Sequence, residues 1–297
     1  YYVRNNALNM HKSYNPYSFI GIGQEIDGIL AFFDGVNEKG FAAATLYFAG
    51  YAKYKTQSNY IDKEPISSLD FLDYILGRCG SVKELKEILL EICIVGFEDP
   101  VTHTVAPLHW IATDKSGECI VIEQTEKGLQ IFQNQIGVMT NSPDFQWHMT
   151  NLRNYMDVSP TQNDDAYWGK INLQPFGQGG GTVQLPGGYT SPERFVRTAY
   201  QKTHIQTPNN SLEAINACFH IMESVSIPKG VVITNRATYD YTKYTAFINT
   251  NTCEYFFKTY DNTNITSVCL WENYKDSAKP ISLGKLKRQV KFEKIQK

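Results

Sequence analysis

The sequence has 297 residues, of which 42% are hydrophobic and 13% aromatic, and this is ample for a large buried core. Its formal net charge is −2, and no basic patch or stripe stands out, so we predict no nucleic-acid partner. No apolar run approaches the roughly 20 residues that a membrane-spanning helix needs, so we predict no membrane partner either.

The cysteines predict the compartment. Six are widely scattered and show no CxxC spacing: Cys79, Cys93, Cys119, Cys218, Cys253 and Cys269. Most lie in apolar stretches, such as Cys93 in LLEICIVGF, which favours buried free thiols. Free thiols indicate a reducing compartment, so we expect a cytoplasmic protein. The Cys and His spacings match no known zinc-ligand pattern, so we expect no metal.

Short apolar runs separated by turn residues predict strands in the first part of the chain, at residues 18–23, 29–33 and 40–48. The chain itself opens with YYVR, residues 1–4, which has the character of a strand interior without a Met or a polar lead-in. We therefore predict that the sequence is a fragment of a longer protein.

Two helices are predicted next, because apolar residues recur at helical spacing over residues 67–76 and 81–92. The second begins with Ser81 and has Glu84 three residues later, which is the capping-box spacing. Turn residues then separate three strands of a predicted meander, at residues 108–113, 119–123 and 129–133.

The stretch GVMTNSPDFQWHMTNLRNY holds the first candidate site residue. Its apolar start, residues 137–140, predicts a strand that runs into Asn141 and Pro143, and residues 144–155 predict an amphipathic helix. An amide at the end of a strand holds a side-chain donor at the edge of a sheet. Such a donor cannot attack a substrate, but it can stabilise the negative charge that an attack creates. We interpret Asn141 as an oxyanion stabiliser.

A glycine-rich loop, FGQGGGTVQLPGG at residues 176–188, raises the question of phosphate binding. The GxGxxG pattern does not fit because Thr182 occupies its last position, and no Lys-Ser/Thr pair follows to make a P-loop. We expect a structural loop or the wall of a pocket there, and therefore no nucleotide cofactor.

The last part of the chain returns from helices to strands. Ser191 is a predicted N-cap, with Pro192 as the first residue of a helix to residue 204. A second helix is predicted over 211–225. Strands are then predicted at residues 231–234, 244–249, 254–260 and 266–271.

The order of predicted elements is strands, two helices, strands, helices, strands. Two sheets lying between helical layers would bury the apolar faces of all these elements economically. No internal repeat and no linker of disordered composition divides the chain. We therefore predict an α+β fold in a single domain over residues 1–297.

Two further residues are candidates for the site. Arg194 falls in the first turn of a predicted helix, where a cation opposes the helix macrodipole, so it suggests a functional task such as holding an anion or a thiolate. The alternative is an ion pair with Glu193 or another carboxylate. Tyr47 ends a strand of small residues, and its backbone N–H can complete an oxyanion hole with Asn141. Taken alone, Tyr47 has the character of a core or rim residue.

No histidine completes a catalytic triad. His109 lies in the apolar strand PLHWIA and His148 lies beside Trp147 on a predicted helix, so packing is the favoured interpretation for both. Neither GxSxG nor HExxH occurs, which disfavours a hydrolase with a nucleophile elbow and a zinc protease.

Taken together, these segments resemble one enzyme family. Seven blocks in family order carry the resemblance: DGVNEKG at 34–40, LYFAGY at 46–51, PLHW at 107–110, MTNSPDFQWHMTNLRNY at 139–155, FGQGGGTVQLPGGYTSPERFVR at 176–197, IPKGVVIT at 227–234 and YDN at 260–262. The chain resembles the choloylglycine hydrolase family, which contains penicillin V acylases and conjugated bile salt hydrolases. The resemblance implies an N-terminal nucleophile hydrolase with a four-layer αββα sandwich, a small-molecule amide substrate, no cofactor and a homotetramer.

The same resemblance implies a nucleophile that this sequence does not supply. In the family it is a Cys exposed by removal of the initiator Met, and the free α-amine of that Cys acts as the base. By resemblance this Cys and the first strands should precede Tyr1, and none of the six cysteines is N-terminal. We therefore expect a fold that lacks its first strands and a chain that is inactive as given.

By resemblance, Asn141 matches the oxyanion-hole amide, Arg194 matches the Arg beside the catalytic Cys, and Tyr47 matches the position that gives a backbone N–H to the hole. That last position is commonly Tyr in penicillin V acylases and Asn in bile salt hydrolases. We therefore expect a hydrolase of linear amides of the penicillin V acylase type. The alternatives are a conjugated bile salt hydrolase, an acyl-homoserine lactone acylase and, from another class, an inactive remnant or binding protein.

Overall fold

The structure is a computed structural model that describes residues 2–4, 16–26, 29–54, 62–96, 98, 104–273, 280–286 and 290. Its central feature is an antiparallel sheet with the strand order β15-β1-β2-β3-β4-β7-β8-β9. These strands are β15 (Ile281–Ser282), β1 (Tyr2–Arg4), β2 (Phe19–Ile26), β3 (Ile29–Asn37), β4 (Ala42–Tyr47), β7 (Leu108–Thr113), β8 (Cys119–Thr125) and β9 (Gly128–Gln133).

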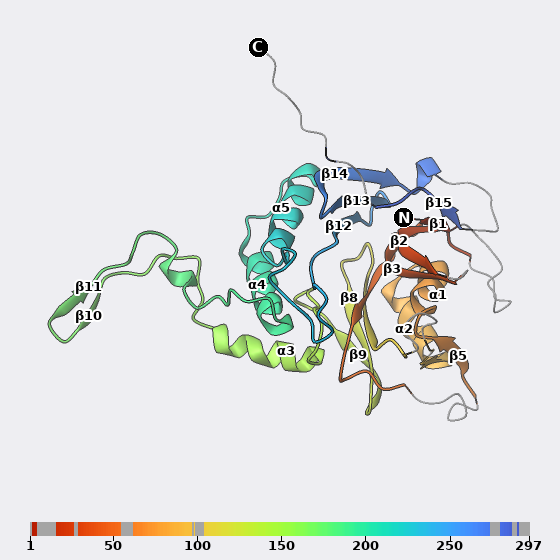
Figure 1. The fold of residues 1–297 in the computed structure, drawn as a ribbon, viewed down its shortest axis with the longest axis horizontal. Helices are drawn as coiled ribbons and strands as arrows, with labels where there is room; N and C mark the ends of the chain where they lie inside the picture. The colour runs from red at the N-terminus through yellow and green to blue at the C-terminus, as the bar shows by residue number, and fades with distance from the viewer. Residues whose placement is uncertain are drawn as a thin grey trace, which may run out of the picture.

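Three other layers complete the sandwich (Figure 1). One face of the large sheet is covered by α1 (Phe71–Arg78) and α2 (Val82–Glu91). A smaller antiparallel sheet forms the third layer, with β12 (Tyr244–Asn249), β13 (Glu254–Thr259) and β14 (Asn262–Cys269). The fourth layer holds α4 (Ser191–His204) and α5 (Ser211–Glu223), and α5 contacts β12. This arrangement confirms the predicted α+β fold with four αββα layers.

The first core lies between α1, α2 and the large sheet. Phe71 meets the buried ring of Trp110 edge-on, with ring centroids 4.7 Å apart. The buried side chain of Asn37 donates from Nδ2 to the carbonyls of Leu76 and Cys79, at 2.8 and 2.7 Å. Because these carbonyls lie at the C-terminal end of α1, where helical partners run out, this contact ties the helix to β3.

The second core lies between the two sheets. Ile20, Val36 and the rings of Tyr255 and Phe257 are buried there. Asp34 accepts hydrogen bonds from the hydroxyls of Tyr244, at 2.6 Å, and Tyr255, at 2.5 Å. Burial raises the pKa of Asp34 despite these bonds.

A third apolar cluster joins α4 to α3 (Phe145–Asn151) and to β8. It contains Val121, Phe145 and Phe195, all buried. Because α3 begins four residues after Asn141, this cluster sets where the candidate site residue lies. The short helix η2 (Leu152–Tyr155) continues α3, as the predicted helix over 144–155 requires.

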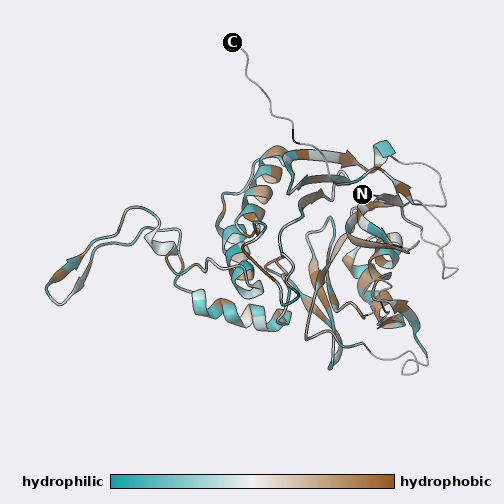
Figure 2. Cartoon of the chain, viewed as in Figure 1, coloured by the Kyte–Doolittle hydropathy of each residue, from teal (hydrophilic) through white to brown (hydrophobic). Residues whose placement is uncertain are grey.

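An arm projects from the layered body between η2 and α4 (Figure 1). It carries β10 (Ala166–Trp168) and β11 (Ile171–Leu173), which pair only with each other among the described strands. Tyr167 and Trp168 are 69% and 76% exposed. The hydrophobic colour in Figure 2 reaches this end of the arm as well as the core.

Most predicted elements are present, with shifted ends. The predicted helix 191–204 and the predicted strands 108–113 and 244–249 have the predicted bounds. The opening residues form β1, as expected for a strand, although Tyr1 lies outside the described residues. Six short elements were not predicted. They are the two arm strands, the paired strands β5 (Glu64–Ser67) and β6 (Ile92–Val95), and the 3₁₀ turns η3 (Gly180–Thr182) and η4 (Trp271–Asn273).

Three predictions of local structure are wrong. Residues 137–140 form no strand, because the Asn134 side chain binds their backbone: it donates to the carbonyl of Val138 and accepts from the N–H of Gly137. Residues 231–234 lie between two turns and form one isolated bridge, from Ile233 to Tyr239, rather than a strand. The N-cap of α4 is Thr190 rather than Ser191. Separately, among the helices that the structure describes, none has the length and hydrophobicity needed to cross a bilayer.

Candidate active site

Asn141 is held at three polar atoms by three different elements. Its Nδ2 donates to the carbonyl of Tyr47 on β4 at 2.8 Å. Its Oδ1 accepts from Nη2 of Arg194 on α4 at 2.7 Å. Its backbone carbonyl lies 2.9 Å from Nε2 of His148 on α3. The structure thus brings together all three predicted site residues and adds His148.

These partners fix the orientation of the Asn141 carboxamide. A guanidinium can only donate and a carbonyl can only accept, so Oδ1 must face Arg194 and Nδ2 must face Tyr47. An amide nitrogen carries two hydrogens, and only one of them is used in these contacts. Among the described residues, no acceptor is bonded to the second hydrogen, so Asn141 retains one oriented donor for a ligand.

Tyr47 contributes its backbone rather than its ring. The N–H of the next residue, Phe48, donates to the carbonyl of Pro107 towards β7. Because successive residues of a strand direct their N–H and C=O groups to opposite sides, those of Tyr47 point away from β7, towards Asn141. The β3–β4 ladder ends at Ala44, so no described strand covers Tyr47 on that side. The side chain is 55% exposed, which fits the rim interpretation.

Arg194 forms no ion pair within the described part of the chain. Its Nε donates to the carbonyl of Tyr189 at 3.0 Å, at the end of the glycine-rich loop. Burial lowers the pKa of Arg194 from its usual value, and the charge of Asp240 partly offsets this effect. The alternative of a pair with Glu193 is wrong, because that carboxylate instead accepts from Gly188 and Thr190.

The glycine-rich loop is a structural loop. Gln162 binds it at both ends of a turn, donating to the carbonyl of Gly177 and accepting from the N–H of Gly180. Gly179 has a φ of 89°, in the region that favours glycine, and begins the turn η3. Tyr189, whose carbonyl accepts from Arg194, follows this loop directly.

The loops after β4 and around Asn141 are joined and border a cleft. Ser142 Oγ donates to the carbonyl of Ala49 at 2.6 Å. A cleft of about 340 Å³ lies beside these loops, between the residues after β4, the β8–β9 hairpin and the start of α3, and Asn141, Tyr47 and Arg194 are not part of its lining. Its lining is Gly50, Tyr51, Lys53, Thr125, Glu126, Lys127, Gln130, Phe132, Asp144 and Gln146.

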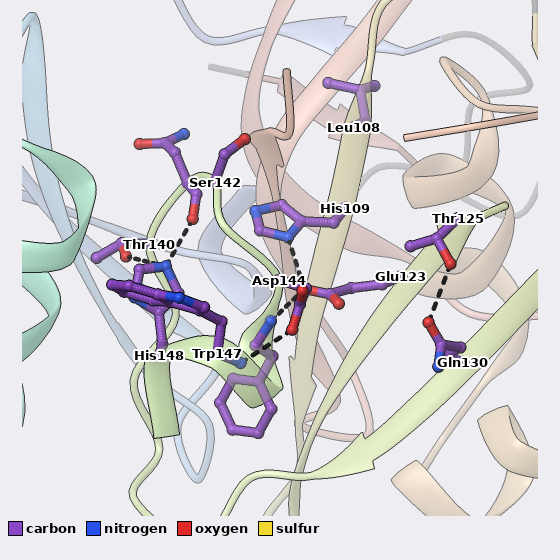
Figure 3. A network of polar contacts seen from close by, with 12 residues as sticks. Leu108, His109, Glu123, Thr125, Gln130, Thr140, Ser142, Asp144, Trp147 and His148 are labelled. Atoms are coloured by element: carbon purple, nitrogen blue, oxygen red, sulfur yellow. Dashed lines mark hydrogen bonds and ion pairs between the residues drawn. The ribbon is translucent and has the colours of Figure 1, made fainter. Parts of the chain in front are cut away.

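Polar contacts join the buried side chains of His148, His109 and Glu123 to their neighbours (Figure 3). The predicted packing of His148 is confirmed, since its ring stacks on Phe195 with centroids 4.6 Å apart. Its bond to Asn141 was not predicted. His109 is also buried, as predicted, with Nδ1 3.3 Å from Oε1 of Glu123. One feature of the sequence could have indicated this bond. His148 lies on the apolar side of a predicted helix, where a buried polar group needs a hydrogen-bond partner.

The cysteines do not supply an attacking group to this site. All six are unpaired, and among the described residues no hydrogen bond joins a thiol to Asn141, Tyr47 or Arg194. Burial raises the pKa of the Cys119 thiol to about 11, and it also raises the pKa of Cys79. Such thiols are poor nucleophiles at neutral pH. The described residues also contain no cluster of three or more His, Cys, Asp or Glu that could hold a metal.

Comparison with known proteins identifies the family. Residues 1–283 match the linear amide C-N hydrolases of the choloylglycine hydrolase family. A bile salt hydrolase/transferase of Clostridium perfringens is 35% identical over 266 residues, which are 89% of this chain and 80% of that protein. A crystal structure of a mutant conjugated bile acid hydrolase from the same organism has a TM-score of 0.89 at 30% identity, and covers 99% of this chain and 91% of that one.

A more distant relative is a penicillin V acylase of Pectobacterium atrosepticum, which is 26% identical over 255 residues, 80% of this chain and 61% of that protein. The match over residues 1–283 includes all seven sequence blocks and the three residues that meet at Asn141. The chain belongs to the choloylglycine hydrolase family of linear amide C–N hydrolases.

Proposed function

We propose that this chain carries the oxyanion-stabilising half of an active site that hydrolyses conjugated bile salts. The observation that supports the hydrolytic part is the Asn141 carboxamide, oriented by Tyr47 and Arg194 with one N–H left for a ligand. A donor held in advance of the reaction stabilises developing negative charge without reorganisation.

The proposed reaction uses the nucleophile that the resemblance implies, a Cys ahead of Tyr1. The free α-amine of that Cys takes the thiol proton, and the thiolate attacks the amide carbonyl carbon. The carbonyl oxygen becomes an oxyanion and accepts from Asn141 Nδ2 and from the Tyr47 N–H. Collapse breaks the C–N bond, and the amine leaves with the proton from the ammonium. Water then attacks the thioester and releases the acid and the thiol.

Arg194 has two tasks in this proposal. It orients Asn141 by donating to Oδ1 at 2.7 Å. Its positive charge, not cancelled by any described carboxylate in contact, favours the thiolate over the thiol of a neighbouring Cys. Burial of the guanidinium strengthens this effect, because charges interact more strongly where water is excluded.

The substrate preference rests on the relatives, and it corrects our expectation from Tyr47. That expectation put penicillin V acylase first. The bile salt hydrolase relative is 35% identical over 89% of the chain, against 26% over 80% for the penicillin V acylase. Bile salt hydrolysis is therefore the better supported proposal. Penicillin V remains the second candidate substrate because of Tyr47, and acyl-homoserine lactones are the third substrate class to assay.

Parallel assays on the full-length gene product test this choice. We expect glycine release from glycocholate with a kcat/KM at least tenfold above that for phenoxyacetate release from penicillin V. The reverse ratio would restore the penicillin V interpretation. The variant Tyr47→Asn keeps the backbone N–H, so any shift in the ratio reports on the side chain alone, and Tyr167→Asn, at a tyrosine that is 69% exposed on the arm, is the matched control.

The nucleophile is tested separately. Sequencing upstream of the Tyr1 codon should reveal a Met-Cys start, and Cys→Ala at that position should abolish turnover of every substrate. A folded full-length protein with no such Cys and no turnover would support the alternative of an inactive remnant or binding protein. The homotetramer and the cytoplasmic location stay predictions, to be checked by sedimentation and by cell fractionation.

A further inference from the structure

His148 is a buried histidine that the proposed chemistry does not use. It is 2% exposed, lies in the middle of α3, and stacks on Phe195 of α4 with an interplanar angle of 13°. A buried imidazole is costly unless its polar atoms are bonded. Its Nε2 lies 2.9 Å from the backbone carbonyl of Asn141, so the bond connects the histidine directly to the candidate oxyanion donor.

The hydroxyls of Thr140 and Ser191, together with the Asn141 carbonyl, establish that His148 is the donor in its bond to Asn141. Thr140 Oγ1 donates to the carbonyl of Ser191, and Ser191 Oγ donates to Thr140 Oγ1, so both hydroxyl protons are engaged. The carbonyl of Asn141 can only accept. Nε2 of His148 must therefore carry the proton and donate it to Asn141.

The imidazole is held in its neutral form. Burial lowers the pKa of His148, and the charges of Arg194 and His109 act in the same direction, whereas its bond to the Asn141 carbonyl and the charge of Asp144 act against it. Its Nδ1 is buried with no hydrogen-bond partner in the described part of the chain. A second proton at Nδ1 would be unpaired, so one tautomer is strongly favoured.

The helix that carries His148 is itself anchored to the large sheet (Figure 3). The N–H of Phe145 donates to Oε1 of Glu123, a fully buried carboxylate on β8, at 3.0 Å. Asp144 caps the same turn by accepting from the N–H of Trp147 at 2.9 Å. The position of the imidazole is thus fixed both by the anchored helix that carries it and by stacking on the Phe195 ring.

We propose that His148 is a positioning residue that sets the oxyanion donor through the backbone of Asn141. The carboxamide is oriented by Tyr47 and Arg194, whereas within the described part of the chain the bond from His148 holds the backbone carbonyl of the residue from which that carboxamide extends. A small rotation of this peptide displaces Nδ2 from the position where it meets the oxyanion. The inference rests on the proposed role of Asn141, and it assigns no direct contact between His148 and substrate.

The test is a double-mutant cycle in the full-length enzyme, with kcat and KM measured well below the unfolding temperature. His148→Leu removes the donor, and His148→Gln places an amide N–H near the position of Nε2. We expect His148→Leu to lower kcat tenfold or more with KM changed less than threefold, and His148→Gln to recover most of kcat. His220→Leu is the matched control, since that histidine is 78% exposed on α5.

The Asn141→Ala background separates the inference from the proposed function. If His148 acts through Asn141, His148→Leu causes less than a twofold further loss there. An equal loss in both backgrounds would overturn the inference while leaving the role of Asn141 intact. Unchanged kcat in His148→Leu would overturn it too. Unchanged turnover in Asn141→Ala alone would instead reject the proposed function, and the inference with it.

Discussion

The Asn141 loop, residues 141–143, and the β10–β11 arm both connect elements of the layered body, and they differ in what holds them. The loop is bonded to β4, α3 and α4, and its partner Tyr47 lies 94 residues away in the sequence. The arm is held by its own residues, such as Asp165, which accepts from Asn172 and Gln174.

This difference separates a site that depends on the whole fold from a segment that does not. Long-range hydrogen bonds fix a side chain only when the elements that carry them are already in place. The donor geometry at Asn141 should therefore respond to changes in distant elements. Changes in the arm should leave both the site and the stability of the layered body unaffected.

The largest expected effect is at Asn141 itself. Asn141→Ala removes an oriented oxyanion donor and should lower kcat by roughly 10²–10³. The matched control is Asn172→Ala, which removes an amide of the arm and should leave kcat unchanged. Steady-state kinetics with glycocholate measures both. Comparable losses in the two variants would erase the distinction between loop and arm.

The next effect is on stability, through the anchor of α3. Glu123→Ala leaves the N–H of Phe145 and the ring of His109 without their buried partner, and should lower the free energy of unfolding by about 3 kcal/mol. Gln130→Ala, on the adjacent strand and only half-buried, is the control. Urea unfolding measures the difference. A loss below about 1 kcal/mol would show that this anchor is not needed.

A smaller effect is expected at the start of α4 and depends on pH. The Thr190 hydroxyl, donating to the Glu193 carboxylate at 2.6 Å, lowers the pKa of Glu193, as do the N–H groups of Thr190 and Gly188. Because the folded-state pKa lies below the unfolded one, this stabilisation is present above the unfolded pKa and is lost as pH falls through the folded pKa.

Glu193→Gln should accordingly cost about 0.5 kcal/mol at pH 7 and less at pH 3. Thermal unfolding of both proteins at the two pH values measures the change. A difference that grows on acidification would contradict the sign of the Glu193 shift.

The smallest effect is expected in the arm. Replacing Trp168 and Ile171 by Ser should change kcat little and the free energy of unfolding by less than about 0.5 kcal/mol, because these side chains are 76% and 64% exposed. Unfolding should be measured at two protein concentrations. A concentration-dependent midpoint that the variant loses would mean that another chain covers the arm.

The sequence predicted those parts of the fold whose pattern is periodic. The helix 191–204 has apolar residues at helical spacing, and its bounds are those of α4. The strands 108–113 and 244–249 alternate or run apolar between turn residues, and they match β7 and β12. Asn141, Arg194 and Tyr47 came from short blocks and a family resemblance, and the structure brings them into contact.

What the sequence could not predict depends on individual side-chain contacts rather than on periodicity. Residues 137–140 have the composition of a strand, yet the side chain of Asn134 binds their backbone and no neighbouring strand does. His148 has the spacing of a packing residue, and its bond to Asn141 follows from the direction of α3 against Phe195. Neither outcome follows from propensity, because the first is decided by a side-chain bond within the turn and the second by packing of α3 against α4.

The carboxylate of Asp34 has a consequence for how the two sheets are aligned. The hydrophobic effect is non-directional, so it does not by itself fix how two apolar sheet faces are aligned. Hydrogen bonds are directional, and Asp34 accepts one from Tyr244 on β12 and one from Tyr255 on β13. A shift of the small sheet along the large one would break both bonds at once. This single side chain therefore fixes the position of one sheet relative to the other.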